Sequence, residues 1–171
     1  RGRAFGLAVC VVTGVVAGLV WLGEAAAAPS LPSGFRLVDY ATGMGLYNLT
    51  SFEFTDDGGL LSVGKDGRVN FTPPGASPYQ LTQVPSIRDV HDFGLLGLSL
   101  GNDYSADGTV YLLYAELNGD GTQNGHAVLS EWRATPPLRP TSFTLRRTIL
   151  AGSKTSPAWT QNTLSHGIGT V

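Results

Sequence analysis

Short apolar runs that alternate with turn residues dominate the chain from residue 49 onward. In the clearest example, residues 94–114, an apolar run at 95–100 and a β-branched and aromatic run at 109–114 flank a polar segment rich in Asn, Asp and Gly. Asn and Asp tolerate a left-handed backbone, and Gly adopts it without a Cβ clash. Apolar runs this short fit strands better than helices. We therefore predict two strands joined by a tight turn.

Residues 54–71 follow the same order of apolar strands and Asp-Gly turns, so two similar units favour radial β repeats over a single hairpin. Alternation in a later strand places Val128, Ser130 and Trp132 on one face. No segment beyond the first thirty residues carries a helical period, and many short strands with turn signals are typical of a sandwich, barrel or propeller. The fold class is therefore predicted to be all-β. The other predicted strands are 35–40, 49–54, 59–63, 68–71, 81–84, 127–133 and 142–150.

Composition narrows the class of protein. Hydrophobic residues make up 42% of the chain and charged residues only 14%, so the chain can bury a core and is not of a disordered type. The net charge of -2 lacks the excess of positive charge that is typical of nucleic-acid-binding proteins. Cys10 is the only cysteine, which excludes an intrachain disulfide and a cysteine zinc site.

Residues 1–28 have the layout of a secretory signal peptide. A start with two arginines leads into an apolar stretch that ends in a run of alanines, and we expect cleavage after Ala27 or Ala28. The alternative is an uncleaved membrane anchor, since about 20 apolar residues can span a bilayer. We favour the signal peptide because no charged cluster follows it, and we expect a secreted or periplasmic protein. Residues 29–34 are expected to form a linker.

Three polar segments carry candidate chemistry. Residues 118–122 place oxygen ligands at alternate positions, as calcium loops do, but lack the closing acidic residue, so a solvated turn is favoured. His91 and Asp92 are candidates for an acid–base pair, although from these residues alone a polar strand edge is favoured. His126 is expected to be solvated in a polar loop.

Motifs of one known family occur in four segments. In chain order these are LPSGF at 31–35 with GL at 45–46; FxDDGxL at 54–60 with KDGRV at 65–69; GLLGL at 94–98 with DY at 103–104, G at 108, VY at 110–111 and Y at 114; and HGIG at 166–169. Together they resemble the glucose/sorbosone dehydrogenase family of soluble, PQQ-dependent sugar dehydrogenases. The third segment is the most specific of the four.

The resemblance implies a six-bladed β-propeller, of which residues 35–171 are the N-terminal part, roughly the first two blades. It also implies oxidation of an aldose at its anomeric carbon by hydride transfer to PQQ, with calcium as a second cofactor. The partners implied are a small-molecule sugar and an electron acceptor. The general base of the family carries over to His166. Polar residues directly before GLLG line the site in relatives, which makes Asp92 and His91 candidates for contacts with the substrate or cofactor.

The chain also departs from the family pattern. Phe93 stands where the family has a polar or basic residue, and the family's calcium ligands and most PQQ contacts belong to later blades, so no metal ligand is assigned here. We expect this chain alone to be inactive. Two alternatives to the dehydrogenase remain: a non-catalytic extracellular propeller that binds carbohydrate or protein, and a lactonase-type propeller hydrolase.

Overall fold

A computed structural model describes residues 30–36, 40, 48–119, 121–151 and 160–161. The chain divides into two units, Arg1–Leu37 and Val38–Val171. The predicted leader, residues 1–28, lies outside the described residues. Of the predicted strand at 35–40, only residues 35, 36 and 40 are described, and none of these is in a strand. Among the residues the structure describes, no helix has the length and apolar character needed to span a bilayer.

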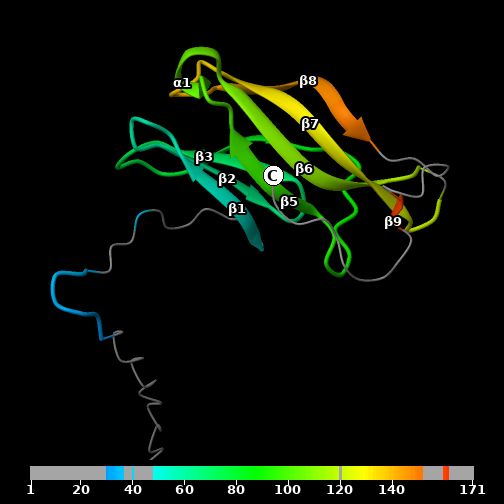
Figure 1. Ribbon diagram of the computed structural model, residues 1–171, viewed down its shortest axis with the longest axis horizontal. Coiled ribbons are helices and arrows are strands. Elements are labelled where there is room, and N and C mark those ends of the chain that lie inside the picture. Colours follow the sequence, from blue (N-terminus) through cyan, green and yellow to red (C-terminus); the bar gives the residue numbers. More distant parts are fainter. Residues whose placement is uncertain (1–29, 37–39, 41–47, 120, 152–159, 162–171) are drawn as a thin grey trace, which may run out of the picture. The chain divides into compact units, whose positions relative to one another are not determined.

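Two antiparallel sheets make up the second unit, and in each the strands lie in chain order (Figure 1). The first sheet contains β1 (Leu49–Phe54), β2 (Leu60–Gly64), β3 (Arg68–Thr72) and β4 (Tyr79–Gln83). The second sheet contains β5 (Leu95–Leu100), β6 (Thr109–Leu117), β7 (Gly125–Thr135) and β8 (Ser142–Ala151). A short strand, β9 (Thr160–Gln161), pairs with the start of β7. The strands predicted from residue 49 onward are thus confirmed.

A single helical turn, α1 (Tyr104–Asp107), joins β5 to β6 where the sequence predicted only a tight turn. Gly108 ends it with a left-handed φ of 71°, and its N–H donates to the Tyr104 carbonyl oxygen at 2.7 Å. This is the usual way for glycine to terminate a helix. The backbone of Gly108 is also held by β7, because the Ala134 N–H donates to the Gly108 carbonyl oxygen at 2.8 Å.

The core lies between the two sheets. Val128, Ser130 and Trp132 are all buried, as their alternation predicted. The Trp132 ring stacks on Phe143 with centroids 5.3 Å apart, and its Nε1–H donates to Ser130 Oγ at 2.8 Å. Each large apolar side chain buried here contributes about 1.5–3 kcal/mol to folding. The other members of the core are Leu61, Val63, Val69, Phe71, Val84, Leu95, Leu98, Tyr104, Val110, Leu112, Tyr114 and Ala134.

The first strands of the two sheets lie next to each other, and so do the fourth strands. Between β1 and β5, Thr50 Oγ1 donates to the Leu95 carbonyl oxygen at 2.6 Å. Toward the outer strands, Tyr79 Oη donates to the Pro140 carbonyl oxygen at 2.8 Å. Four-stranded sheets packed face to face in this order are neighbouring blades of a β-propeller. The structure therefore confirms an all-β chain that forms two blades of a partial propeller.

Candidate functional site

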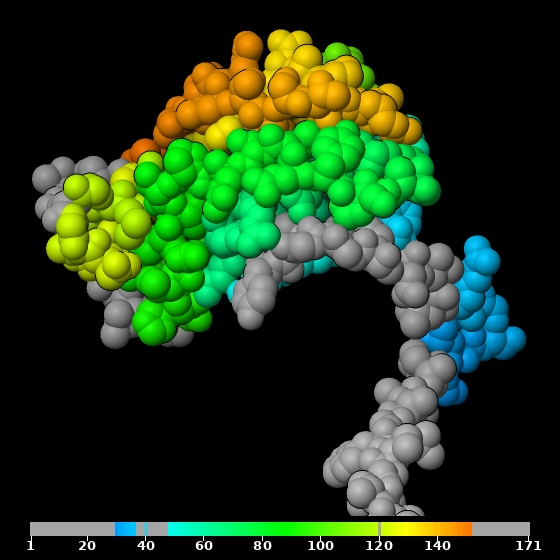
Figure 2. Space-filling model, turned by 180° about the vertical axis from the view of Figure 1, so that it is seen from behind, coloured from blue at the N-terminus to red at the C-terminus, as the bar shows by residue number. Residues whose placement is uncertain are grey.

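One end of the two sheets gathers the polar residues that the sequence singled out. Because the strands alternate in direction, the β2–β3 turn at 65–67, the β4–β5 connection at 84–94 and the β6–β7 loop at 118–124 all lie at this end. We call the described residues of these three segments the loop face. In Figure 2 the second and third segments form neighbouring lobes, green and yellow-green. The opposite end of the sheets carries α1 (Figure 1).

His91 and Asp92 lie side by side in sequence on an exposed turn of the loop face. The turn is closed by the Phe93 N–H, which donates to the Val90 carbonyl oxygen at 3.0 Å. His91 has a left-handed φ of 51°, uncommon for a residue with a Cβ, and Lys65 Nζ donates to its carbonyl oxygen. The lysine thus helps hold the backbone at His91 while the two side chains remain accessible to a dissolved molecule.

Gly94, the first residue of the GLLG motif, is fixed by close contact with Lys65. A Cβ at this position would lie 2.5 Å from Lys65 Cγ and 2.6 Å from the Lys65 carbonyl oxygen. The next residue, Leu95, donates its N–H to the same carbonyl oxygen at 3.0 Å. The motif therefore needs glycine here because two backbones pass each other without room for a side chain.

Beneath this turn lies a buried arginine, Arg88, whose burial has no signal in the sequence. Arg88 is 2% exposed, and its guanidinium carbon lies 3.7 Å from the centroid of the fully buried Phe93 ring. This is a cation–π contact, and burial lowers the pKa of Arg88. Its Nε donates to the Gln123 carbonyl oxygen in the neighbouring loop. The aromatic residue that departs from the family pattern is thus the stacking partner of a buried cation.

His126 was expected to be solvated in a loop, and this prediction was wrong. It belongs to β7, where it pairs with Glu116 of β6, and its side chain is 16% exposed. Its Nδ1 lies 2.9 Å from Asn118 Oδ1, and its Nε2 lies 3.4 Å from Glu116 Oε2. The Asn118 Nδ2 atom is buried without a hydrogen-bond partner. Cross-strand pairing extends β6 to Leu117 and brings these polar groups together.

The described part of the chain does not supply a cofactor site by itself. It contains no group of three or more His, Cys, Asp or Glu side chains able to hold a metal ion. Asp120 of the calcium-like segment lies outside the described residues. Three cations lie on or beside the loop face: Lys65 donates to the His91 carbonyl oxygen, Arg68 at the start of β3 pairs with Asp66 at 2.6 Å, and Arg88 is buried. With one arginine buried and the other paired, these cations do not by themselves form a site for the anionic carboxylates of PQQ, whereas exposed His91 and Asp92 can contact a sugar.

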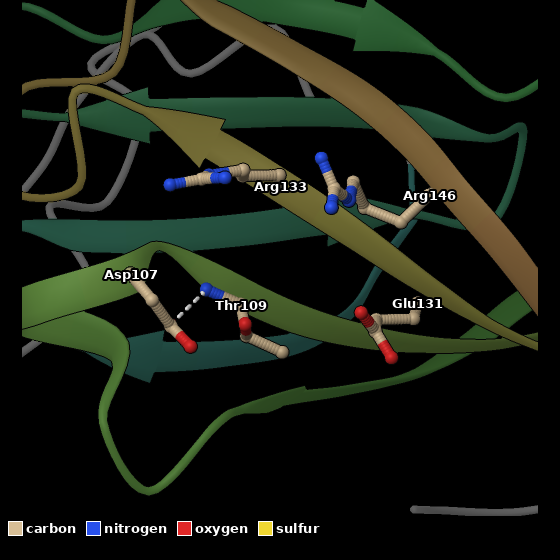
Figure 3. A pocket seen from close by; sticks show the side chains of 5 residues that line it. All are labelled: Asp107, Thr109, Glu131, Arg133 and Arg146. Carbon is tan, nitrogen blue, oxygen red and sulfur yellow. Dashed lines mark hydrogen bonds between the residues drawn. The ribbon is translucent and has the colours of Figure 1, made fainter.

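A small hollow of about 150 Å³ lies on the second sheet, lined by Asp107, Thr109, Glu131, Arg133 and Arg146 (Figure 3). It lies toward the α1 end of the sheet. Its carboxylates are engaged: Asp107 Oδ1 accepts the Thr109 N–H at 2.8 Å, and Glu131 pairs with Arg147 at 2.8 Å. Pockets for small molecules usually exceed about 300 Å³. We therefore place the candidate site on the loop face.

His166, the predicted general base, lies outside the described residues. The nearest described segment is β9, which pairs with β7 so that Gln161 lies opposite Gly125 and Thr160 opposite His126. This pairing brings the chain to the loop face five residues before His166. The role of His166 stays a prediction.

Comparisons with known proteins give a family and a fold. The family model of Glucose / Sorbosone dehydrogenase matches residues 46–155, more than half of the chain. No curated protein matches this chain. Among solved structures, 28 chains match.

Three of the similar structures, each with a TM-score above 0.5, show the fold. An oxidoreductase from Thermus thermophilus, described as a glucose dehydrogenase, has a TM-score of 0.55 and 21% identity, over 66% of this chain and 31% of its own. The PQQ-bound aldose sugar dehydrogenase from Streptomyces coelicolor has a TM-score of 0.57 and 17% identity, over 68% and 34%. The apo-form of the soluble aldose sugar dehydrogenase from Escherichia coli has a TM-score of 0.51 and 23% identity, over 62% and 30%. The chain therefore covers about one third of the length of these proteins.

Proposed function

The chain belongs to the glucose/sorbosone dehydrogenase family, and from this premise we propose that the full-length protein is an oxidoreductase that oxidises a sugar. The family match covers residues 46–155 and includes both sheets and the loop face. The fold likeness to two aldose sugar dehydrogenases supports the same class of reaction.

The finer proposal is that an aldose loses hydride from its anomeric carbon to PQQ, with calcium as the second cofactor. One of the similar structures is a PQQ-bound form, which supports this cofactor for the family. When bound, the quinone supplies the redox chemistry, and the protein supplies binding and orientation. Most of the groups that hold the quinone and the metal would have to come from outside the described residues, because Arg68 is paired, Arg88 is buried and the described residues contain no metal cluster.

The observation that carries the proposal is the exposed pair His91 and Asp92 on a turn fixed by Lys65. A carboxylate accepts hydrogen bonds from sugar hydroxyls, and an imidazole can donate or accept them. His166 would accept the proton of the anomeric hydroxyl as hydride leaves, a role suited to imidazole near neutral pH. His91 and Asp92 thus orient the sugar, and His166 moves the proton.

The test uses the full-length protein reconstituted with PQQ and calcium, with dye reduction followed over a panel of aldoses. His166→Ala is assayed alongside, and PQQ binding is measured separately for both proteins. Turnover in the wild type that falls by at least about a thousandfold in the variant, with PQQ binding retained, supports the dehydrogenase and the general base. A variant with unchanged turnover contradicts the role of His166.

The second candidate is a non-catalytic propeller that binds carbohydrate through the loop face. Two observations favour it. Arg68 is paired with Asp66 and Arg88 is buried, so neither arginine is placed to bind an anionic quinone. Sugar binding without PQQ binding or turnover would establish this function. Hydrolysis of a lactone without quinone binding would instead indicate the lactonase-type propeller.

Export from the cytoplasm is also part of the proposal, supported by the signal-like pattern of residues 1–28. Expression of the full-length protein in its host, followed by cell fractionation and N-terminal sequencing, tests it. A secreted or periplasmic product that begins near Ala28 or Pro29 supports cleavage of a signal peptide. A membrane-bound product that retains the leader indicates the anchor, and a cytoplasmic product contradicts export.

A further inference from the structure

Arg88 occupies an unusual position for an arginine, because this residue type is almost never fully buried unless its charge has partners. It is 2% exposed, and its guanidinium carbon lies 3.7 Å from the Phe93 ring centroid. Phe93 itself is fully buried and directly follows Asp92 in the chain. The planar cation therefore packs against the residue that anchors the end of the exposed turn.

The side chain of Arg88 also reaches a second segment of the loop face. Its Nε donates to the carbonyl oxygen of Gln123, which lies 35 residues further along the chain. Its aliphatic stem crosses the start of β7 at Gly125, where a Cβ would lie only 2.8 Å from Arg88 Cδ. One side chain thus contacts both the turn that carries Asp92 and the loop that ends at β7.

The backbone around Arg88 is held independently of this side chain. The Arg88 N–H donates to the Ala115 carbonyl oxygen at 2.9 Å, and the Leu117 N–H donates to the Ser86 carbonyl oxygen at 2.8 Å. Ile87 also pairs with Glu116 as an isolated antiparallel bridge. Replacement of the side chain should therefore leave this segment docked on β6 while it releases Gln123 and the Phe93 ring.

From this geometry we propose that Arg88 is a positioning residue that holds the 84–94 and 118–124 segments in one arrangement and thereby fixes Asp92 and His91 for the sugar. The proposal rests on the function proposed above. Arg88 acts through Phe93 and Gln123 and does not itself touch the substrate. Because Asp92 and His91 bind the sugar in this scheme, loss of their fixed placement should raise KM more than it lowers kcat.

The test compares Arg88→Met, Arg88→Lys and the wild type in the full-length protein loaded with PQQ and calcium. Methionine keeps much of the stem volume and removes the charge and the donor, whereas lysine keeps the charge and can restore a hydrogen bond to Gln123. The matched control is Arg146→Met, an exposed arginine on the second sheet. Amide hydrogen exchange, KM and kcat for an aldose, and the thermal midpoint are measured for each.

For Arg88→Met we expect exchange of the hydrogen-bonded amides of Asn118 and Asn124 to become at least about tenfold faster, with the centre of β6 still protected. KM should rise by about tenfold while kcat changes by less than about threefold. Arg88→Lys should recover part of both effects, and Arg146→Met should show neither.

Unchanged exchange of the Asn118 and Asn124 amides in a folded Arg88→Met variant would overturn the proposed link between the segments. Faster exchange with an unchanged KM would overturn its role in sugar placement. If Arg88→Met does not fold, Arg88→Lys decides, because it should still show faster exchange and a higher KM than the wild type. A wild-type protein that oxidises no sugar would overturn the proposed function and the catalytic consequence, and the exchange result would then decide the structural link alone.

Discussion

Thr50 in β1 donates a hydrogen bond of 2.6 Å from its hydroxyl to the carbonyl oxygen of Leu95 in β5. This contact joins the first strands of the two sheets. The same hydroxyl lies 3.2 Å from the Val63 carbonyl oxygen within its own sheet. The sheets meet mainly through apolar side chains, whose attraction has no preferred direction, so this hydroxyl adds a directional contact, as Tyr79 does toward Pro140.

Replacement of Thr50 by valine tests that contact, because valine has nearly the same shape but no hydroxyl. We expect a loss of about 1–3 kcal/mol in the free energy of unfolding, since the Leu95 carbonyl oxygen loses its donor in a partly buried place. Chemical denaturation of the full-length protein measures this loss of unfolding free energy. Thr144→Val, at an exposed position of β8, is the control and should change stability by less than about 0.5 kcal/mol. Equal losses of unfolding free energy in Thr50→Val and Thr144→Val would contradict a stabilising hydrogen bond from Thr50 to Leu95.

Gly108→Ala should be among the most damaging single changes in the second sheet. Gly108 has a φ of 71°, and an added Cβ would lie 2.0 Å from the Ala134 carbonyl oxygen. Gly75→Ala is the matched control, with a φ of 67° and no atom within 4 Å of the added Cβ. We expect the control to lose about 1–2 kcal/mol from the left-handed backbone alone and Gly108→Ala to lose clearly more. Thermal unfolding of both variants measures the two losses of stability. Similar losses would mean that β7 shifts to make room for the added Cβ.

Tyr104 should make the protein less stable in alkali. Burial, with smaller contributions from Asp57 and Tyr79, raises the pKa of Tyr104 to about 12, and its hydroxyl donates to the Pro137 carbonyl oxygen at 2.6 Å. The folded state therefore favours the neutral phenol. Its stabilising contribution is complete below the unfolded pKa of about 10 and is lost as pH rises toward 12.

Denaturation curves at several pH values between about 9 and 12 would measure this loss in the wild type and in Tyr104→Phe. The slope of unfolding free energy against pH should be smaller in the variant, because phenylalanine has no proton to lose. Some slope remains, since burial also raises the pKa of Tyr114. Identical slopes in the two proteins would contradict the shift at Tyr104.

His91→Gly separates the backbone of the exposed turn from its side chain. Because His91 has a φ of 51°, glycine should keep or raise stability by up to about 1 kcal/mol, while His91→Ala should not. If the imidazole contacts the sugar, both variants should raise KM in the full-length enzyme, and Asp92→Asn should do the same. An unchanged KM in all three folded variants would remove this turn from the site.

The strands could be predicted because each is a short apolar or alternating run bounded by turn residues such as Gly, Pro, Asn or Asp. α1 was missed because one helical turn is too short to show a helical period. The burial of Val128 and Trp132 followed from two-residue alternation, which depends only on local geometry. Strand pairing and the order of strands within each sheet follow from short connections between consecutive strands.

The candidate site was less predictable, because its arrangement depends on contacts between distant segments. His91 and Asp92 were found through the motif that follows them. Arg88 carries no local signal of burial, since a long charged side chain becomes buried only when Phe93 and Gln123 close around it. His126 was placed wrongly because no local pattern indicates that β6 runs on to pair with it.

The four consecutive strands of each sheet come from one stretch of chain, residues 49–83 for the first and 95–151 for the second, and β9 at 160–161 joins the second sheet afterwards. During synthesis, all the strands of the first sheet leave the ribosome before any strand of the second sheet does. Chains are synthesised at about 5–20 residues per second, and N-terminal domains generally fold first. The strands of the first sheet can therefore begin to pair seconds before the second sheet is complete, and the hydrogen bond from Thr50 to Leu95 can form only after β5 has emerged.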